Sequence, residues 1–258
     1  MVMGILNSTP DSFYPFSRVD ENEALNRVRE WERLGCDLVD VGGESSRPGS
    51  ESVDVQTELS RVLPVVERLT QSCKIPISID TTKPAVMRAC AQLGASWLND
   101  ISALEDPEMI DIVKEFNLYV ILLHKKGDPK TMQINPEYQD VVSEVKNFLL
   151  SRAQHALQAG IPREHIWLDP GIGFGKKLEH NLQLLHALPE LSRLGFPVVV
   201  GLSRKRWIGD LWGEGDRLAG SLVGAIYCLT HGATMVRVHD VPETLQAITV
   251  MRALWTKF

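Results

Sequence analysis

Short apolar runs recur along the chain, separated by longer stretches in which apolar residues return at helical spacing. A short apolar run bounded by turn residues predicts a buried strand, and the spacing between the runs predicts amphipathic helices. The pattern predicts eight strands, each followed by sequence that can form a helix. They cover residues 2–6, 37–41, 75–79, 96–99, 119–123, 166–168, 197–201 and 235–238.

A second pattern marks the junctions from helix to strand. Five times a helical stretch ends at glycine and an apolar run follows, as in "RLGCDLVDV" and "THGATMVRVHD". Glycine is favoured just after a helix because it adopts the left-handed conformation without steric cost. The pattern therefore predicts helix ends at Gly35, Gly94, Gly160, Gly195 and Gly232.

The strands are apolar throughout, as in "YVILL" and "VVVGL", rather than alternating between apolar and polar residues. Such strands are typical of a parallel sheet that helices cover on both faces. Eight strand–helix units in 258 residues predict an α/β fold with a single (β/α)8 TIM barrel spanning residues 1–258. A doubly wound sheet has the same alternation and stays open as the alternative.

Composition narrows the classes of partner. The net charge is −6, and no cluster of Lys and Arg indicates a nucleic-acid or membrane surface. The first residues lack a basic segment followed by a long apolar one, so we expect a cytoplasmic protein. The cysteines have no C-x-x-C pairing and are expected to be reduced thiols in the core: Cys36, Cys73, Cys90 and Cys228.

Polar residues stand at the end of every predicted strand. In a barrel these ends meet at one mouth, where catalytic groups lie. One polar residue before a helix is usually an N-cap, and this explanation stays open for Asp11 and Asp100. Because capping does not explain the whole set, we expect a ring that binds a small polar ligand.

The ring divides by charge. Carboxylate and amide oxygens of Asp80, Asn99 and Asp169 suit a heterocycle with ring N–H and amino donors. Donors suited to an anion come from Lys205, Arg237 and His239. In "RVH" the last two are two residues apart on a strand and project to the same side, which indicates a phosphate or pyrophosphate. An ion pair for Arg237 and a backbone hydrogen bond for His239 remain alternatives.

Other chemistries fit the sequence poorly. The glycines of "HIWLDPGIGFGKK" match neither a Walker loop nor a dinucleotide fingerprint. Ser203 in "GLSRK" lacks the second glycine of a nucleophile elbow. The histidines do not have the H-E-x-x-H spacing of a zinc site.

Nine phrases in a fixed order resemble the dihydropteroate synthase family: "GILNSTPDSF", "DVGGESSRPG", "SIDTTKP", "NDIS", "GDPKTMQ", "LDPGIGFGK", "GLSRK", "GSL" and "VRVHDVPET". The resemblance runs nearly end to end. It implies a TIM barrel that condenses 6-hydroxymethyl-7,8-dihydropterin pyrophosphate with 4-aminobenzoate, releasing pyrophosphate and 7,8-dihydropteroate. It also implies Mg2+, a homodimer, competition by sulfonamides and a dissociative reaction through a pterin-methyl cation.

The resemblance also implies roles for individual residues. The pterin would be bound by Asp80, Asn99, Asp169, Lys205, Phe174 and Gly201. The pyrophosphate and its metal would be held by Asn7, Arg237 and His239, with Asn7 as the metal ligand. The aminobenzoate side would be lined by Ser46, Arg47, Pro48, Phe174 and Ser203. The groups expected to act in catalysis are Asn7, Arg237, His239 and Lys205.

The chain departs from the family pattern at three places. The first loop has Tyr14, Pro15 and Phe16 where the family often has an acidic, glycine-rich segment, and Lys125 stands where a Met often packs near the pterin. Ser46 replaces a common Thr. These changes keep two alternatives open: a catalytically silent pterin-binding paralogue and a pterin-dependent methyltransferase of the same superfamily.

Overall fold

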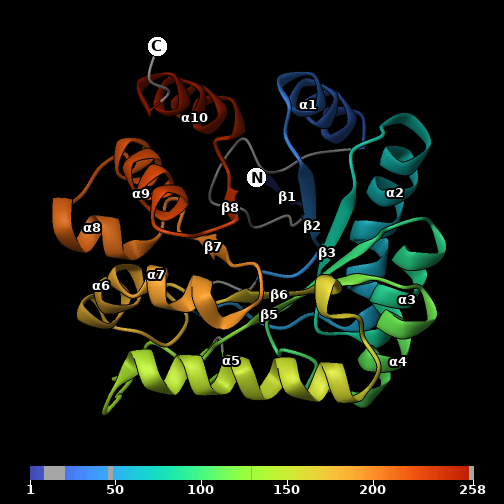
Figure 1. Cartoon of the computed structure of the whole chain (residues 1–258). Coiled ribbons are helices and arrows are strands. Elements are labelled where there is room, and N and C mark those ends of the chain that lie inside the picture. The colour runs from blue at the N-terminus through green and yellow to red at the C-terminus, as the bar shows by residue number, and fades with distance from the viewer. Residues whose placement is uncertain (9–20, 46–48, 129, 256–258) are drawn as a thin grey trace.

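The computed structural model describes residues 1–8, 21–45, 49–128 and 130–255. In these ranges eight strands alternate with helices around a central barrel (Figure 1). The strands are β1 (Val2–Asn7), β2 (Leu38–Gly42), β3 (Ile77–Asp80), β4 (Trp97–Asp100), β5 (Tyr119–Leu123), β6 (Ile166–Asp169), β7 (Val199–Gly201) and β8 (Met235–Val238). Each predicted apolar run therefore contains a strand.

Every strand pair is parallel, and the hydrogen-bonded order is β6-β5-β4-β3-β2-β1-β8-β7. The remaining gap closes between the two terminal strands, β6 and β7. There Leu168 forms a parallel bridge with Val198, and its N–H donates to the Pro197 carbonyl at 2.9 Å. The sheet thus closes on itself, which confirms the TIM barrel and excludes the doubly wound alternative.

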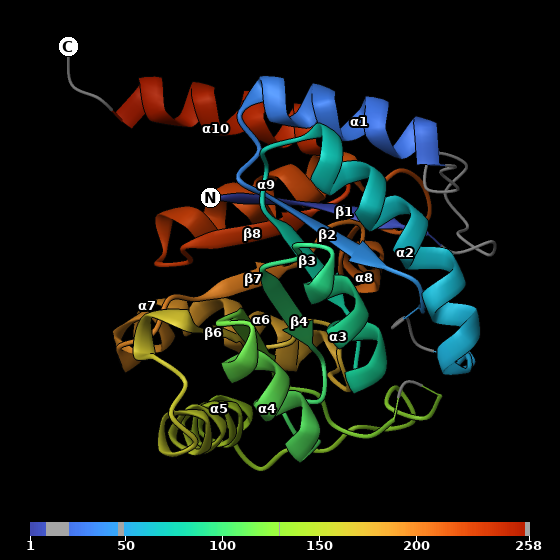
Figure 2. The same cartoon turned by 90° about the vertical axis from the view of Figure 1, so that its right-hand side faces the viewer.

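The helices form an outer layer around the barrel (Figures 1 and 2). They are α1 (Glu21–Leu34), α2 (Val55–Ser72), α3 (Pro84–Gln92), α4 (Pro107–Glu115), α5 (Val141–Gln158), α6 (Leu178–His186), α7 (Leu188–Leu191), α8 (Arg206–Trp212), α9 (Leu218–Thr230) and α10 (Val241–Trp255). Short 3-10 turns, η2 (Arg163–His165) and η3 (Ser192–Leu194), lead into β6 and β7. No helix in the described ranges has both the length and the apolar character that a membrane crossing needs.

The helix ends confirm the predicted junctions. All five glycines have positive φ: 90° at Gly35, 106° at Gly94, 94° at Gly160, 83° at Gly195 and 108° at Gly232. An L side chain would be strained in this conformation. The four cysteines are free, and three of them are buried, so the core-thiol prediction holds except for the half-buried Cys73.

An apolar plug fills the barrel near the amino ends of the strands. It consists of seven buried residues that pack as one cluster: Met3, Leu38, Trp97, Ile121, Trp167, Val199 and Met235. Side chains two residues apart on a strand point to the same side. The residues two positions after the plug therefore also face the barrel interior, one layer closer to the carboxyl ends. That layer includes Asp40, Asn99, Asp169, Gly201 and Arg237.

Candidate active site

The strand register gathers polar residues at the carboxyl ends of the strands. Asn7 of β1 lies opposite Gly42, which lies opposite Asp80 of β3, which lies opposite Asn99 of β4. On the other side of the barrel, Gly201 of β7 lies opposite Arg237. The predicted residues of strands that are distant in sequence thus reach one mouth.

A buried carboxylate organises the centre of this layer. Asp40 has 0% exposed surface and accepts hydrogen bonds from three side chains. The Ser78 hydroxyl lies 2.6 Å away, the Asn99 amide nitrogen 3.0 Å, and the Arg237 Nε 2.6 Å. Because the Asn99 amide nitrogen is used by Asp40, its oxygen is the end left for the mouth. This carboxylate therefore fixes which atoms of its neighbours a ligand meets.

Our sequence analysis missed Asp40, although a signal was present. The strand "LVDVG" is apolar except for this one acid. A lone carboxylate inside a strand that is otherwise buried needs partners, because burying an unpaired charge is costly. Asp40 lies two residues after Leu38 of the plug, so its side chain points to the same, inner side of the barrel.

The predicted separation of acceptors from donors is incomplete in the structure. Arg237 forms ion pairs with both Asp40 and Asp80, at 2.6 and 2.7 Å. The ion pair that we kept as an alternative for Arg237 is thus present. Its Nη1 group has no hydrogen bond within the described ranges, so one edge of the guanidinium can still meet an anion.

Burial shifts the pKa values of the charged groups here. Burial raises the pKa of Asp80 to about 7, against the opposing attraction of Arg237. Burial also raises the pKa of Asp169, although Lys205 opposes it. For Lys205 burial lowers the pKa to about 8. Shifted pKa values of this kind cluster at functional sites, because such sites bury charged groups that later interact with a ligand.

The loop after β6 forms one wall of the mouth. The Asp169 Oδ1 atom accepts from the Gly171 N–H at 2.7 Å, which starts the loop with a tight turn. The Lys205 ammonium donates to the Ile172 carbonyl and lies 4.5 Å from the centre of the Phe174 ring. Phe174 is 8% exposed and packs with other apolar residues of the mouth. The predicted residues Asp169, Phe174 and Lys205 are therefore neighbours.

The two remaining predicted residues of this half are His239 and Ser203. His239 follows β8, and its N–H donates to the Ser203 hydroxyl at 3.2 Å. The His239 Nδ1 lies at the same distance from that hydroxyl. Ser203 is 5% exposed, so its side chain is directed to His239 rather than to open solvent. Gly201 leaves room beside Lys205, whose Nζ would lie 3.8 Å from an added Cβ.

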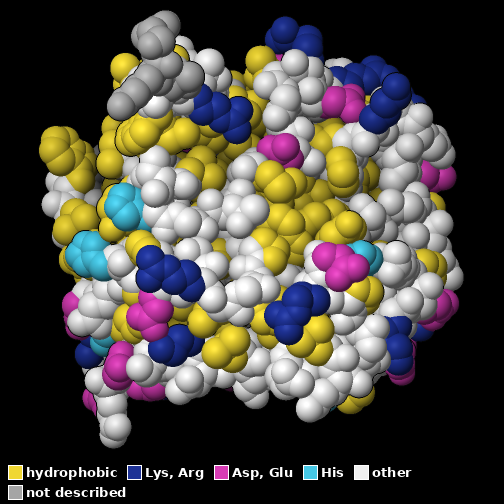
Figure 3. Space-filling view, in the orientation of Figure 1, with side chains coloured by type: hydrophobic (Ala, Val, Ile, Leu, Met, Phe, Trp, Pro, Cys, Tyr) yellow, Lys and Arg dark blue, Asp and Glu magenta, His cyan; other side chains and the backbone are white. Residues whose placement is uncertain are grey.

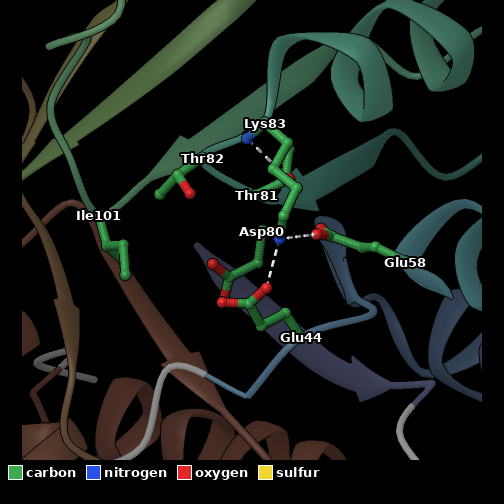
Figure 4. A pocket seen from close by; sticks show the side chains of 7 residues that line it. All are labelled: Glu44, Glu58, Asp80, Thr81, Thr82, Lys83 and Ile101. Atoms are coloured by element: carbon green, nitrogen blue, oxygen red, sulfur yellow. Dashed lines mark hydrogen bonds and ion pairs between the residues drawn. The ribbon is translucent and has the colours of Figure 1, made fainter. Parts of the chain in front are cut away.

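A second charged cluster lies next to Asp80 and lines a small pocket (Figure 4). Lys83 bridges Glu44 of the loop after β2 and Glu58 of α2, the latter at 2.5 Å. The Glu58 side chain has 0% exposure, and its Oε1 has no hydrogen-bond partner within the described ranges. Glu44 also accepts from the Val53 N–H at 3.1 Å, which joins the two ends of the loop after β2.

Several predicted positions fall outside this geometry. Ser46, Arg47 and Pro48 lie outside the described residues, as do Asp11 and the departure at Tyr14, Pro15 and Phe16. Asp100 is not a helix N-cap, because Asp106 caps α4; its carboxylate instead closes the turn after β4 by accepting from the Ser102 and Leu104 N–H groups at 2.7 Å each. Lys125 is half-buried, and its charge lowers the pKa of Asp100, which burial raises.

Comparison with known proteins identifies the family. A family model for pterin binding enzymes matches residues 3–239. The dihydropteroate synthase of Escherichia coli K12 is 45% identical over 257 residues, covering 98% of this chain and 90% of that protein.

Two solved structures agree with this result. The Yersinia pestis dihydropteroate synthase in complex with a sulfonamide drug superposes with a TM-score of 0.93 at 41% identity, covering 98% of this chain and 93% of that one. The Xanthomonas albilineans enzyme with 4-aminobenzoic acid gives 0.92 at 44% identity, covering 100% and 93%. The chain belongs to the pterin-binding enzyme family, and within it to the dihydropteroate synthases.

Proposed function

We propose that the barrel mouth condenses 6-hydroxymethyl-7,8-dihydropterin pyrophosphate with 4-aminobenzoate, giving 7,8-dihydropteroate and pyrophosphate. The observation that carries this proposal is a chain of hydrogen bonds in a barrel that matches dihydropteroate synthases over 98% of its length: Asp40 joins Asn99 to Arg237, and Arg237 binds Asp80. We further propose that residues 1–258 form one domain and that the enzyme is cytoplasmic.

The pterin would lie over the inner polar layer. Asp169 would accept from the 2-amino group and N3–H of the pterin, since a carboxylate is an acceptor only. The Asn99 oxygen is available for the same ring system because Asp40 takes the amide nitrogen. Phe174 would supply an apolar wall, and Gly201 would leave space for the ring next to Lys205.

The pyrophosphate would lie toward β1 and β8, at Asn7, Arg237 and His239. Two of the Arg237 nitrogens are held by Asp40 and Asp80, so the guanidinium is already oriented before an anion binds. Donors that are fixed in advance stabilise developing charge without reorganisation. Loss of the pyrophosphate would therefore be assisted mainly at this side.

The residues present fit magnesium as the cofactor. Mg2+ prefers oxygen ligands and commonly uses one or two protein oxygens together with substrate phosphates and water. The Asn7 side chain has no hydrogen bond within the described ranges, so its oxygen is available as a ligand. No group of three His, Cys, Asp or Glu able to hold a metal occurs in those ranges, which is compatible with a site completed by substrate. Bound magnesium would neutralise charge on the departing pyrophosphate.

The aminobenzoate would enter from the side of the loop after β2. Ser46, Arg47 and Pro48 are proposed as its binding residues, with Phe174 between the two substrates. Ser203 is buried against His239, so its contribution to this side would pass through that histidine.

The reaction would break the bond between the pterin methylene carbon and the pyrophosphate oxygen. The aminobenzoate nitrogen is a weak nucleophile, so departure of pyrophosphate would lead and leave a pterin-methyl cation. The amine lone pair would then form the new C–N bond, and the nitrogen would release one proton. Exclusion of water until the amine arrives would prevent hydrolysis of the cation.

One assay tests the proposal. The purified chain is incubated with the pterin pyrophosphate, and pteroate and pyrophosphate are measured with and without aminobenzoate and with and without Mg2+. We expect both products in equal amounts, only when aminobenzoate and Mg2+ are present. Pterin binding without product would favour the silent paralogue, and pyrophosphate release that does not depend on aminobenzoate would contradict the condensation.

We also propose that the enzyme is a homodimer. A groove between α9 and α10 is lined largely by apolar side chains, and hydrophobic residues gather over these helices in Figure 3. Val223, Val250, Leu254 and Trp255 are between 54% and 77% exposed in the single chain. Large apolar surfaces of this kind usually mark an interface.

A further inference from the structure

Lys176 is a buried cation at the mouth that the proposed mechanism does not use. It follows the glycine-rich loop after β6 and is only 3% exposed. Its Nζ lies 2.9 Å from the Gly171 carbonyl oxygen, 3.0 Å from that of Phe174 and 3.2 Å from that of His124. The His124 Nδ1 is a fourth neighbour at 3.0 Å. No carboxylate in the described ranges forms an ion pair with it.

The partners define the protonation of this cluster. Carbonyl oxygens can only accept, so three of them require three N–H donors, which the ammonium has and the neutral amine lacks. Burial lowers the pKa of Lys176, and the three carbonyl dipoles oppose this by favouring the charge. Burial, followed by the charge of Lys176, lowers the pKa of His124 to about 3. The imidazole is therefore neutral, with the proton on Nε2, and its Nδ1 is a fourth acceptor around an ammonium that has three N–H groups, so one N–H is shared between two acceptors.

The ammonium sits where two backbone segments press together. At Gly171, with φ of 67°, an added Cβ would lie 1.9 Å from the His124 carbonyl oxygen. At Gly175, with φ of 63°, it would lie 2.2 Å from the Lys126 carbonyl oxygen. The loop can approach the end of β5 this closely only because both residues are glycine. Lys176 supplies positive charge between carbonyl groups that otherwise repel one another.

The segment that Lys176 holds is the one that carries the proposed pterin contacts. The Gly171 N–H donates to Asp169, and the Ile172 carbonyl accepts from Lys205. The Phe174 ring also lies next to the Lys205 ammonium. Lys176 binds the carbonyl groups of Gly171 and Phe174, on either side of Ile172. It therefore touches the loop but none of the groups proposed to meet the pterin directly.

We propose that Lys176 is a positioning residue of the pterin site, whose buried ammonium fixes the loop after β6 against β5 and keeps Asp169 in its charged, acceptor form. The proposal rests on the assignment of this mouth to a pterin. The positive charge of Lys176 lowers the pKa of Asp169, against the raising effect of burial. Removing that charge should make Asp169 easier to protonate.

The test measures binding of 6-hydroxymethylpterin by calorimetry between pH 5 and pH 8, for the wild type, Lys176→Met, Lys176→Gln and Lys177→Met. Met removes both charge and donors, whereas Gln removes the charge and keeps two N–H donors. Lys177 is the matched control, because it is the adjacent lysine and is not among the main influences on the pKa of Asp169. Thermal melts and circular dichroism establish that each variant is folded.

The expected readout is a change in the pH profile. In both Lys176 variants the acid midpoint for pterin binding should move up by about one pH unit, and affinity at neutral pH should fall about tenfold. Met should also raise KM for the pterin pyrophosphate more than Gln does, because it removes the side-chain donor from three carbonyl groups, of which that of Gly171 keeps the Phe174 N–H as a partner. Lys177→Met should leave both quantities unchanged.

Other titratable or charged groups around Asp169 are the same in all variants, so they do not account for a difference in the pH profile of pterin binding. Lys205 and Arg237 face it from the loop after β7 and from β8, and Cys228 faces it from α9. Asp80, with a pKa of about 7, also titrates in this range. All four are present in every variant, and Lys176 is not among the main influences on the pKa of Asp80. Lys176 also lowers the pKa of His124, so the same series is measured in a His124→Gln background. A shift between Lys176 variants that persists in this background reports on Asp169.

The outcomes separate this proposal from the proposed function. Failure of the wild type to bind the pterin would contradict the assignment of the mouth without involving Lys176. Wild-type binding together with unshifted midpoints in folded Lys176→Met and Lys176→Gln would overturn the positioning role. If neither variant folds, Lys176 is a determinant of the whole barrel, and the role confined to the pterin site is likewise wrong.

Discussion

At the scale of single residues, the charged groups of the mouth are buried before any ligand arrives. Asp40 has 0% exposed surface, and Arg237 spans it and Asp80. Taking charges out of water is costly unless each one is paired and hydrogen bonded. The network meets this condition for Asp40 and leaves the outer atoms of Asn99 and Arg237 for a ligand.

Asp169→Asn should separate the acceptor role from simple packing. The substitution keeps the shape of the side chain but replaces one acceptor oxygen by an N–H donor facing the pterin donors. We expect pterin affinity to fall by about 2 kcal/mol or more, because one donor is left unpaired on burial. Calorimetry with 6-hydroxymethylpterin measures the loss. Near-native affinity in a folded variant would contradict the proposed role.

The pKa shifts predict a narrow pH window for binding. Below its pKa of about 7, Asp80 gains a proton and stops being a pure acceptor. Above its pKa of about 8, Lys205 loses its proton and its charge. Pterin binding should therefore be strongest between these two values and weaken on both sides. Affinities measured across this range check the prediction, and Lys205→Arg should move only the alkaline limb, because arginine does not titrate there.

The residues of the site differ in how far sequence could predict them. Asp80, Asn99 and Asp169 follow apolar runs directly, so their position at the mouth could be inferred from strand ends alone. Asp40 and Lys176 could not be assigned partners, because those partners lie on other strands and on the backbone of the adjoining loops. Contacts of this kind depend on the closed register of the barrel, which one sequence does not show.

At the scale of elements, strand starts were the weakest part of the sequence prediction. β3 begins at Ile77 rather than residue 75, and β7 begins at Val199 rather than residue 197. Pro76 and Pro197 explain both differences, since proline has no N–H to donate to a neighbouring strand. The strand ends, where the functional residues lie, were predicted to within one residue.

The link between α2, α3 and the loop after β2 gives a prediction for this scale. Lys83 compensates Glu58, which is fully buried, and also binds Glu44. Lys83→Met leaves a buried carboxylate without its cation and should lower the free energy of unfolding by about 3 kcal/mol. Urea unfolding measures the loss.

A triple variant, Glu44→Gln with Glu58→Gln and Lys83→Met, provides the control. It removes all three charges together, so most of the lost stability should return. Glu44 joins the two ends of the loop after β2, and Gln at this position keeps an oxygen that can accept from the Val53 N–H, so KM for aminobenzoate should stay near the wild-type value in the triple variant. A raised KM in a triple variant that has regained its stability would contradict a purely structural role of the cluster.

At the scale of the whole molecule, the apolar face of α9 and α10 predicts association. Val250 and Leu254 are 54% and 77% exposed, so their replacement by Glu should cost little in the isolated chain. Val250→Glu with Leu254→Glu should convert a dimer to a folded monomer in sedimentation velocity. Ile134→Glu, at a site that is 75% exposed elsewhere on the surface, is the matched control and should remain dimeric. A wild type that sediments as a monomer at micromolar concentration would contradict the dimer.

The apolar plug has a consequence for the order of events. Trp97, Trp167 and their neighbours close the barrel at the amino ends of the strands, so both substrates and both products must pass through the mouth at the carboxyl ends. The groups assigned to the pterin lie directly above the plug, at the floor of that passage. The pterin pyrophosphate should therefore bind first, because aminobenzoate that binds early would block the path to the floor. The closed end of the barrel thus imposes an ordered rather than a random sequence of substrate binding.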